Sequence, residues 1–311
     1  MRPMSPEHLV KLLRCPCGGE LEHMDGSDGC ARCGREYHRF GTKPVIIREE
    51  RSVITPPSGD ANAGLVDRPG RVAAAVSRFI FGGSPRSSIN LRRFVRELHG
   101  ELDPPVVLVV GGAEDGFGHE ELSSAEGLLV RFDVYDSESV DFLADAHEIP
   151  LHDGSVDGVI VQAVLEHVLE PQMVVDEIHR VLRPNGIVYA ETPFMQQVHE
   201  GAFDFTRFTE SGHRWLFRRF SELDAGALRG PWSALLWSVR YAIASVIGSR
   251  QLAGVLCLPF AWVRLFDRVV RRDRDIDGAS DCYFLGRREE QEMRRPDLID
   301  RYGGRRRTPA G

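Results

Sequence analysis

The stretch V-V-L-V-V-G-G-A-E-D-G-F-G, residues 106–118, decides the fold of this chain. A run of valine and leucine without polar alternation is typical of a parallel strand that is buried on both faces. Gly111 and Gly112 then allow a sharp turn in which backbone N–H groups approach a ligand. A strand, a glycine turn and a ligand at the strand's carboxyl end are typical of doubly wound nucleotide-binding folds. The glycine spacing departs from G-x-G-x-x-G, so the loop alone is also compatible with an ordinary turn.

Apolar segments that continue the same plan follow this strand. They predict strands over residues 127–135, 140–145, 152–164 and 186–192, and a helix over 171–182. Arg183-Pro184-Asn185-Gly186 ends that helix, since Asn-Gly readily adopts the left-handed turn. Two further helices are predicted before the glycine strand, over 71–81 and 89–98. Strands that alternate with helices predict an α/β fold with a mainly parallel, doubly wound sheet.

The bulk properties of the sequence exclude some classes of protein. With 311 residues the chain has room for one sizeable domain and a small one. The net charge of −7 argues against a general nucleic-acid-binding protein. The chain does not start with a charged and then apolar segment, so we expect no signal peptide. Four cysteines lie within the first 33 residues, which favours metal binding in a reducing compartment and a cytoplasmic location.

The cysteines near the start of the chain form two close pairs, C-P-C-G-G and C-A-R-C-G. Four thiolates at such a spacing complete a closed tetrahedral zinc site, and the predicted ligands are Cys15, Cys17, Cys30 and Cys33. A single residue separates Cys15 from Cys17, where two are usual. A ligand set in which His23 or His38 replaces a cysteine is therefore an alternative, as is a ribbon that folds without metal. The segment is too small to build its own core, so metal would supply much of its folding energy.

Two resemblances to known families rest on these and the downstream motifs. Residues 1–48 resemble the zinc-ribbon proteins that activate several methyltransferases, through L-L-R-C-P-C-G-G-E-L, C-A-R-C-G-R-E-Y and K-P-V-I-I. Residues 106–220 resemble class I S-adenosylmethionine-dependent methyltransferases of the small-molecule type. The L-E-H-V motif at 165–168 and R-V-L-R-P-N-G at 180–186 carry this second resemblance.

The methyltransferase resemblance implies a set of cofactor contacts. The glycine loop would contribute Gly111, Gly112, Ala113 and Gly116. Asp133 would accept both ribose hydroxyls, since a carboxylate suits a diol. Asp145 and Ala146 stand where the family contacts adenine, Gln162 and Ala163 would flank the methionine part, and Glu166 and His167 would begin the helix beside the site.

The chain departs from the family at the strand before the glycines. The family often has an acidic residue there that contacts the amino group of the cofactor, whereas this chain has Val109 and Val110. Glu114, four residues further on, is the candidate that compensates. A methyltransferase fold that binds without catalysing is the corresponding alternative.

The segment after the fifth predicted strand is where the family shapes the acceptor pocket. It reads P-F-M-Q-Q-V-H-E-G-A-F-D-F-T-R-F-T and contains His199, Asp204 and Arg207. Because the sulfonium is already an activated methyl donor, a base is needed only for an acceptor that must lose a proton. His199 is the candidate base. Asp204 and Arg207 have an alternative role in which they pair with each other and brace the loop.

Residues 233–270 are unusually apolar. Arg240, Arg250 and Arg264 interrupt the segment and Pro259 breaks it, whereas a membrane span needs about 20 uninterrupted apolar residues. Two helices are therefore predicted. They pack over the sheet edge and cover the acceptor side, or they lie on a membrane surface, and an apolar cover favours a lipid-like or glycan-lipid acceptor.

The predicted organisation has five parts. They are a zinc ribbon (1–48), a linker (49–70), a methyltransferase domain (71–230), an apolar helical extension that completes the domain (231–286) and a disordered tail (287–311). The predicted function is methyl transfer from S-adenosylmethionine to a small-molecule or lipid- or glycan-linked acceptor, in the cytoplasm or at a membrane surface. Modification of RNA or protein, with the ribbon recruiting the substrate, is the alternative. The sequence leaves the oligomeric state open.

Overall fold

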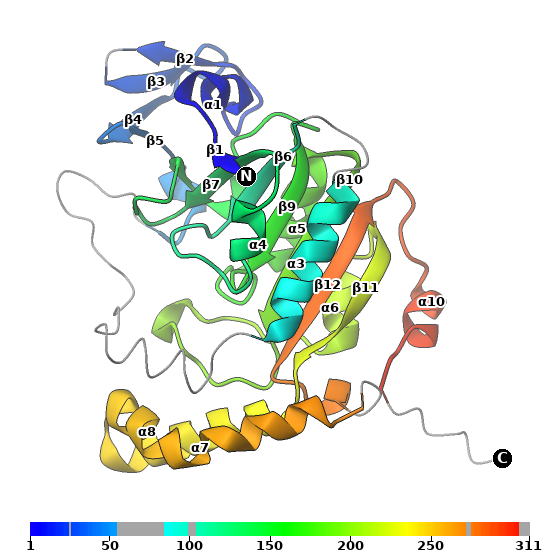
Figure 1. The fold of residues 1–311 in the computed structure, drawn as a ribbon. Coiled ribbons are helices and arrows are strands. Elements are labelled where there is room, and N and C mark those ends of the chain that lie inside the picture. Colours follow the sequence, from blue (N-terminus) through cyan, green and yellow to red (C-terminus); the bar gives the residue numbers. More distant parts are fainter. Residues whose placement is uncertain (25, 55–83, 99–103, 272–274, 305–311) are drawn as a thin grey trace.

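The structure is a computed structural model that describes residues 1–24, 26–54, 84–98, 104–271 and 275–304 (Figure 1). The helix expected over 71–81 and most of the linker expected over 49–70 lie outside these residues.

A twisted sheet forms the centre of the molecule. Its parallel strands are β6 (Val106–Val110), β7 (Leu128–Asp133), β8 (Phe142–Ala144), β9 (Val156–Gln162) and β10 (Leu182–Pro193). They coincide with the five strands predicted from the sequence, with boundaries moved by a few residues. Residues 107–110 of β6 are almost fully buried, which is why the strand shows no polar alternation.

Two more strands extend the sheet beyond β10. β11 (Phe220–Arg229) and β12 (Asp281–Arg288) pair antiparallel, and β12 also pairs antiparallel with β10. The resulting order is β11-β12-β10-β9-β6-β7-β8. It corresponds to the doubly wound order of parallel strands, with the last strand inserted as an antiparallel one. The order in which the strands are added reverses between β6 and β9, which is where such folds bind ligands.

Helices cover both faces of the sheet, as Figure 1 shows. On one face α3 (Pro85–Leu98) and α4 (Glu120–Ser123) pack on β6, β9 and β10, with Leu91, Phe94 and Leu122 in one core cluster. On the other face α5 (Pro171–Val181) and α6 (Glu210–Leu216) contribute to a larger cluster. Two buried layers fix the positions of the strand ends.

The N-terminal segment joins this core. It contains β1 (Arg2–Pro3), α1 (Pro6–Leu12), β2 (Leu21–Met24), β3 (Ser27–Cys30), β4 (Glu36–Phe40), β5 (Lys43–Ile46) and the short 3-10 turn η1 (Glu49–Arg51). β5 pairs parallel with β8, so the ribbon extends the central sheet. Leu13, Cys15 and Tyr37 belong to the large core cluster, and Arg48 Nε donates to Glu148 Oε2 at 2.6 Å. The segment is too small to form a hydrophobic core of its own, and it obtains one by packing against the central sheet.

An apolar arm leaves the sheet after β11. It consists of α7 (Pro231–Ile247), α8 (Arg250–Cys257) and the 3-10 segment η4 (Leu258–Arg268). Figure 1 shows it along the lower edge, away from the strands. Leu236, Cys257 and Ala261 pack against each other within the arm, while Phe260, Trp262 and Val269 are exposed. None of the described helices combines the length and the hydropathy that a membrane span requires.

The structure differs from the expected division at the C-terminus. The expected extension contains η5 (Ile276–Gly278) and most of β12, and the expected tail contains the end of β12 and a helix, α10 (Arg295–Asp300). The strand was missed because its residues D-C-Y-F-L-G follow a long helical segment directly and were assigned to it. The described part of the expected tail thus contains the end of β12 and α10.

Candidate functional site

The glycine loop at the end of β6 meets the end of β9 closely. Gly111 has a φ of 72°, and a Cβ on it would lie 2.3 Å from Val164 Cγ2. Ala163, the residue after β9, has a φ of 53°, a conformation that non-glycine residues rarely adopt. Such strain persists where the surroundings impose it and is common at ligand sites. The two strand ends therefore lie too close together for a side chain on residue 111.

The first cavity lies on the β7 and β8 side of this junction and has a volume of about 440 Å³. The strand ends supply Gly111, Ala113, Asp133, Asp145 and Ala146, and His167 closes one side. Val53 and Ile54 also line it, so the start of the expected linker is part of the site. The lining is largely apolar with acids at the strand ends, which suits a nucleoside.

Both strand-end acids have local partners. Asp133 accepts from the backbone N–H groups of Ala113, at 3.0 Å, and of Val134, at 2.7 Å. It therefore fastens the glycine loop to β7. Asp145 accepts from His147 Nδ1 at 2.6 Å and from Ser52 Oγ at 2.5 Å. Burial would raise the pKa of Asp145, but these hydrogen bonds outweigh it and lower the pKa. Asp145 therefore stays ionised.

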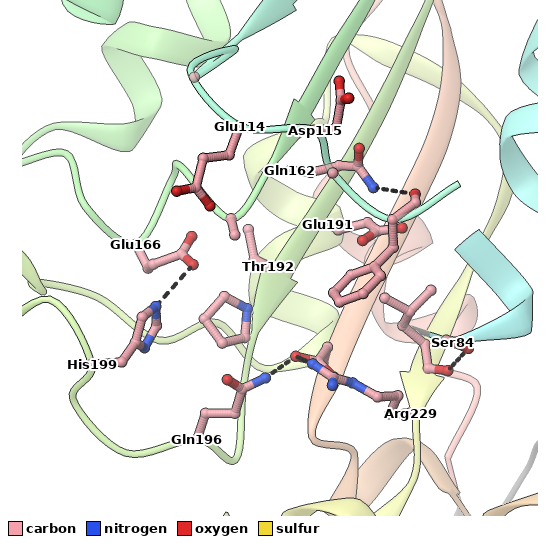
Figure 2. Close-up of a pocket in the computed structure, with 17 residues that line it drawn as sticks. Ser84, Glu114, Asp115, Gln162, Glu166, Glu191, Thr192, Gln196, His199 and Arg229 are labelled. Carbon is pink, nitrogen blue, oxygen red and sulfur yellow. Dashed lines mark hydrogen bonds and ion pairs between the residues drawn. The ribbon is translucent and has the colours of Figure 1, made fainter. Parts of the chain in front are cut away.

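A second cavity of about 290 Å³ lies on the β10 side of the junction (Figure 2). Its acidic and basic lining residues are five acids and one arginine: Glu114, Asp115, Glu166, Glu191, Asp281 and Arg229. Neutral polar groups come from Ser84, Gln162, Thr192, Gln196 and His199. Arg229 Nη2 donates to Asp281 Oδ1 at 2.9 Å, so this cation is neutralised within the lining. Gly111, Glu114, Ala163 and His199 line both cavities and form the boundary between them.

The expected cofactor residues are distributed over both cavities. Gly116, Gln162 and Glu166 line the second cavity, and Gly112 lines neither. Gln162 Oε1 accepts from His119 Nε2 at 2.8 Å and Gln162 Nε2 donates to Phe117 O at 3.1 Å, so the side chain holds the loop. Glu166 and His167 lie in a turn, since α5 begins only at Pro171. The expected helix start at Glu166 is therefore wrong.

His199, His167 and Glu166 face one another at the boundary. The two Nε2 atoms are 3.1 Å apart, and Glu166 Oε1 is 3.6 Å from His167 Nε2 and 3.9 Å from His199 Nε2. Burial lowers the pKa of His167 to about 4 and also lowers that of His199, so both imidazoles are neutral near pH 7. Burial raises the pKa of Glu166 to about 8.

The loop that carries His199 is braced from within. Arg207 Nη2 donates to Asp204 Oδ2 at 2.7 Å and to Gln197 O at 3.1 Å, and His199 N donates to Asp204 Oδ2 at 2.9 Å. The pairing of Asp204 with Arg207, one of the two roles considered from the sequence, is thus present. It fixes the position of His199 relative to the glycine loop.

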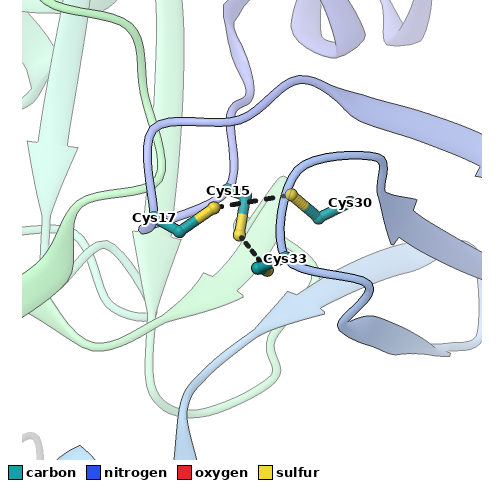
Figure 3. A group of neighbouring side chains, drawn as sticks. All are labelled: Cys15, Cys17, Cys30 and Cys33. Carbon is teal, nitrogen blue, oxygen red and sulfur yellow. Dashed lines mark hydrogen bonds between the residues drawn. The ribbon is translucent and has the colours of Figure 1, made fainter.

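The four N-terminal cysteines converge, as Figure 3 shows. The Sγ atoms of Cys15 and Cys33 are 3.7 Å apart, and those of Cys17 and Cys30 are 3.5 Å apart. Four sulfurs around a tetrahedral zinc at 2.3 Å are separated by about 3.8 Å, so the donors fit this ion. Gly18, with a φ of 82°, allows the tight turn that the short Cys15–Cys17 spacing needs. Among the described residues neither His23 nor His38 belongs to this group.

Comparison with known proteins supports the domain. Residues 121–190 match the family described as "Methyltransferase domain", which spans the segment from α4 to β10. A curated relative from Streptomyces fradiae, an uncharacterised 37.1 kDa protein in a transposon, is 48% identical over 44 residues. That match covers 14% of this chain and 13% of the relative, so the chain spans only a small part of the relative's length.

Several solved structures share parts of the fold. A phosphoethanolamine N-methyltransferase from Haemonchus contortus with bound S-adenosylmethionine has 15% identity and a TM-score of 0.46, covering 75% of this chain and 61% of that one. An S-adenosylmethionine-dependent methyltransferase from Archaeoglobus fulgidus has 14% identity and a TM-score of 0.44, covering 69% and 99%. A complex of the Haloferax volcanii Trm112 methyltransferase activator with a putative methyltransferase has 17% identity and a TM-score of 0.41, covering 71% and 97%. At these values the likenesses say nothing about the acceptor.

The strand order gives the chain a Rossmann-like, doubly wound α/β fold. Within that fold, residues 121–190 are similar to the methyltransferase domain family.

Some lining residues were missed from the sequence. Glu191 and Asp281 lie on β10 and β12, and Arg229 ends β11. Glu191 follows the buried run I-V-Y-A, so it shows the same signal that pointed to Asp133, an acid at the carboxyl end of a buried strand. Asp281 gave no such signal because it stands at the start of a strand that was not recognised.

Proposed function

We propose that this protein transfers a methyl group from S-adenosylmethionine in the first cavity to an acceptor whose reacting group lies in the second cavity. The observation that carries the proposal is that the two cavities meet at Gly111, Ala163 and His199. Methyl transfer from a sulfonium is an in-line displacement, so donor and acceptor must face each other across one boundary. Alignment in such a near-attack geometry supplies much of the rate.

The cofactor's parts are assigned by the chemistry of the lining. Asp133 would accept hydrogen bonds from the ribose hydroxyls, because its carboxylate has lone pairs that are not used by the backbone N–H groups of the loop. Asp145 and Ala146 would face the adenine. Glu114 lines both cavities and is the carboxylate that would meet the ammonium group of the methionine part. It would take the role of the acidic residue that the family often has at the end of this strand, where this chain has Val109 and Val110.

The second cavity indicates the chemistry of the acceptor's reacting end. Five of its lining residues carry carboxyl groups, and an ionised carboxylate only accepts hydrogen bonds. A group rich in hydroxyl or amino donors, such as a glycan, therefore suits it. His199 at the boundary is the residue that we place beside the reacting atom, where it promotes loss of the acceptor's proton.

The apolar arm suits the rest of such an acceptor. Tyr241 of α7 donates to Val198 O at 2.6 Å, and Gln197 donates to Ser238 Oγ at 3.1 Å, so the arm is attached to the loop that carries His199. Among the described residues, none from the arm lines either cavity, so the expected cover over the acceptor is not present. The arm's apolar side chains pack against each other or face solvent instead. A lipid carrier would lie along the arm while the polar head enters the cavity.

The alternative acceptors fit less well. RNA carries a phosphate at every nucleotide, and its recognition depends on cations that neutralise these charges. The carboxylate-rich lining and the net charge of −7 oppose such a substrate. A lipid-linked or small-molecule acceptor is therefore favoured over RNA.

We further propose that the cysteine cluster holds a structural zinc ion. The four sulfurs are at the spacing that this ion requires, and four protein ligands leave no position open for chemistry. Cys15 lies in the core that the ribbon shares with the methyltransferase domain. The zinc would thus stabilise the wall beside β8 and, through Val53 and Ile54, the first cavity.

The acceptor can be found directly. The purified protein is incubated with a cell extract, separated into lipid and aqueous fractions, and with S-adenosylmethionine whose methyl group carries an isotopic label. The proposal predicts a labelled product in the lipid fraction, detected by mass spectrometry. Label that enters only RNA or protein would contradict the proposed acceptor. If wild type gives no more labelled product than the Gly111→Val control, the proposed activity is contradicted.

The proposed lipid contact has its own test. The exposed face of the arm includes Phe260 and Trp262, which are 52% and 57% exposed. Sedimentation with vesicles that contain anionic lipid should retain the wild-type chain and release the Phe260→Asp, Trp262→Asp variant. Equal retention of the two proteins would contradict the proposal that the arm binds a membrane surface.

A further inference from the structure

Glu166 is a buried carboxylate whose local environment does not satisfy it. The side chain has no exposed surface, and neither oxygen accepts a hydrogen bond from the described residues. Burial without a partner is unfavourable for a carboxyl group in either protonation state, and the ionised form becomes favourable only when a cation compensates it. The nearest guanidinium group that acts on it, Arg207, is engaged by Asp204.

The two histidines beside Glu166 present the same nitrogen to each other. His167 Nδ1 lies 2.8 Å from Phe203 O, a carbonyl that can only accept, so Nδ1 carries the proton and Nε2 has a lone pair. His199 Nδ1 faces Asp204 Oδ2 and Gln197 O, both at 3.4 Å, and these atoms are also acceptors. The same tautomer then leaves a lone pair on His199 Nε2. Two lone pairs 3.1 Å apart repel unless a cation lies between them.

A proton does not resolve this arrangement as well as a metal ion would. If His199 Nε2 carried the proton, its Nδ1 lone pair would face Asp204 and Gln197 with no donor between them. A proton on Glu166 cannot bridge to either histidine, because 3.6 and 3.9 Å exceed hydrogen-bond distance. A cation shared by the three side chains satisfies every one of these atoms.

We propose that Glu166, His167 and His199 bind a divalent transition-metal cation at the junction of the two cavities. Figure 2 shows Glu166 and His199 directed toward each other at the edge of the second cavity. Ligand atoms about 2.1 Å from a zinc-like ion lie roughly 3.0–3.4 Å apart. The histidine nitrogens have this spacing, and the carboxylate oxygen lies a fraction of an ångström beyond it.

The surroundings of the histidines match those of metal ligands. A metal-bound histidine usually directs its other ring nitrogen to a carbonyl or a carboxylate, which fixes the tautomer and the orientation of the ring. His167 has Phe203 O in this place, and His199 has Asp204, which Arg207 in turn holds. The hydrogen bonds that brace the loop thus also set the orientation of the His199 ring.

Two imidazoles and one carboxylate leave a coordination position open, as in zinc sites that act on substrates. The open position would face the second cavity, which Glu166 and His199 line. A hydroxyl oxygen of the acceptor bound there would lose its proton to solvent. Its electron pair would then form the bond to the methyl carbon, while the carbon–sulfur pair leaves with the sulfur. In this arrangement His199 acts through the cation.

The test counts metal ions on the full chain and needs no activity. Each protein is stripped with a chelator, reloaded with excess Zn²⁺, desalted and analysed for zinc per chain. Wild type should hold one ion more than Glu166→Gln and His199→Gln, whereas His152→Gln, a histidine outside both clusters, should match wild type. The cysteine cluster contributes equally to all four proteins, so the difference reports the junction alone.

Cobalt distinguishes the two sites by their ligands. Co²⁺ bound to thiolates gives intense charge-transfer absorption, which Glu166→Gln should leave unchanged while the total cobalt falls by one. Equal metal content in wild type and both variants would overturn the proposal. If Glu166→Gln does not fold, judged by circular dichroism, His199→Gln decides. A protein that loses the extra ion but binds no cofactor would contradict the proposed function and leave the metal site standing.

Discussion

The two cavities lie side by side at the same edge of the sheet, yet they are built differently. The first is formed by the ends of consecutive parallel strands, and its acids are engaged by backbone N–H groups and neighbouring side chains. The second combines strand ends from β9, β10, β11 and β12 with a braced loop, and five of its lining residues carry carboxyl groups. A cofactor common to many enzymes can use a pocket set by the fold, whereas the acceptor pocket depends on the elements that vary between them.

The largest effect is expected at the boundary itself. Gly111→Val places a side chain 2.3 Å from Val164 Cγ2 and forces a β-branched residue to a φ of 72°. S-adenosylmethionine binding, followed by calorimetry, should be lost. Gly154→Val is the matched control, since Gly154 has a φ of 58° but no atom closer than 3.9 Å. If Gly111→Val folds and binds the cofactor like the control, the glycine loop does not form the cofactor site.

The next effect separates the two cavities. His199→Ala should lower turnover by about 10²–10⁴-fold, the range for loss of assistance to proton removal. Cofactor affinity should change little, because the first cavity keeps its other lining residues. Turnover and calorimetric affinity are measured on the same preparation. An unchanged turnover would make His199 a structural residue of the loop.

Asp133→Ala is expected to act on the cofactor alone. Removing a carboxylate that accepts hydrogen bonds should weaken S-adenosylmethionine binding by about 1–3 kcal/mol, or about 5- to 150-fold. Asp133→Asn is the comparison, because an amide oxygen can still accept from Ala113 N and hold the loop. Equal affinity of wild type and both variants would remove Asp133 from the cofactor site.

The smallest effect should come from the far wall of the second cavity. Glu191→Gln keeps the shape of the side chain, and its amide oxygen can still accept from the Tyr189 hydroxyl group. We expect the KM for the acceptor to rise about three- to tenfold, the scale of one hydrogen bond, with cofactor affinity unchanged. A change in cofactor affinity without a change in KM would reverse the assignment of the two cavities.

The sequence predicts the first cavity well because its determinants are local. A buried strand that ends in glycine or in an acid, as at Gly111 and Asp133, can be recognised within about ten residues. Residues 52–54 were missed there, because a polar linker gives no sign that it will fold back onto Asp145.

The second cavity was predicted only in part, because its residues come from segments far apart in the chain. Glu191 and Asp281 meet through the antiparallel pairing of β10 with β12, which no local sequence pattern predicts. The pairing of Asp204 with Arg207 could be anticipated from their short separation. The approach of the His167 and His199 ring nitrogens depends on how the loop folds onto the turn after β9, so it could not be anticipated from the sequence.

The most direct test of the assignment is a crystal structure with bound S-adenosylhomocysteine, the product left after methyl transfer. The adenine should lie beside Asp145 and Ala146, the ribose at Asp133, and the sulfur at the boundary formed by Gly111, Ala163 and His199, directed toward the second cavity. A ligand in the second cavity, or one whose sulfur points away from that boundary, would contradict the division into a cofactor cavity and an acceptor cavity.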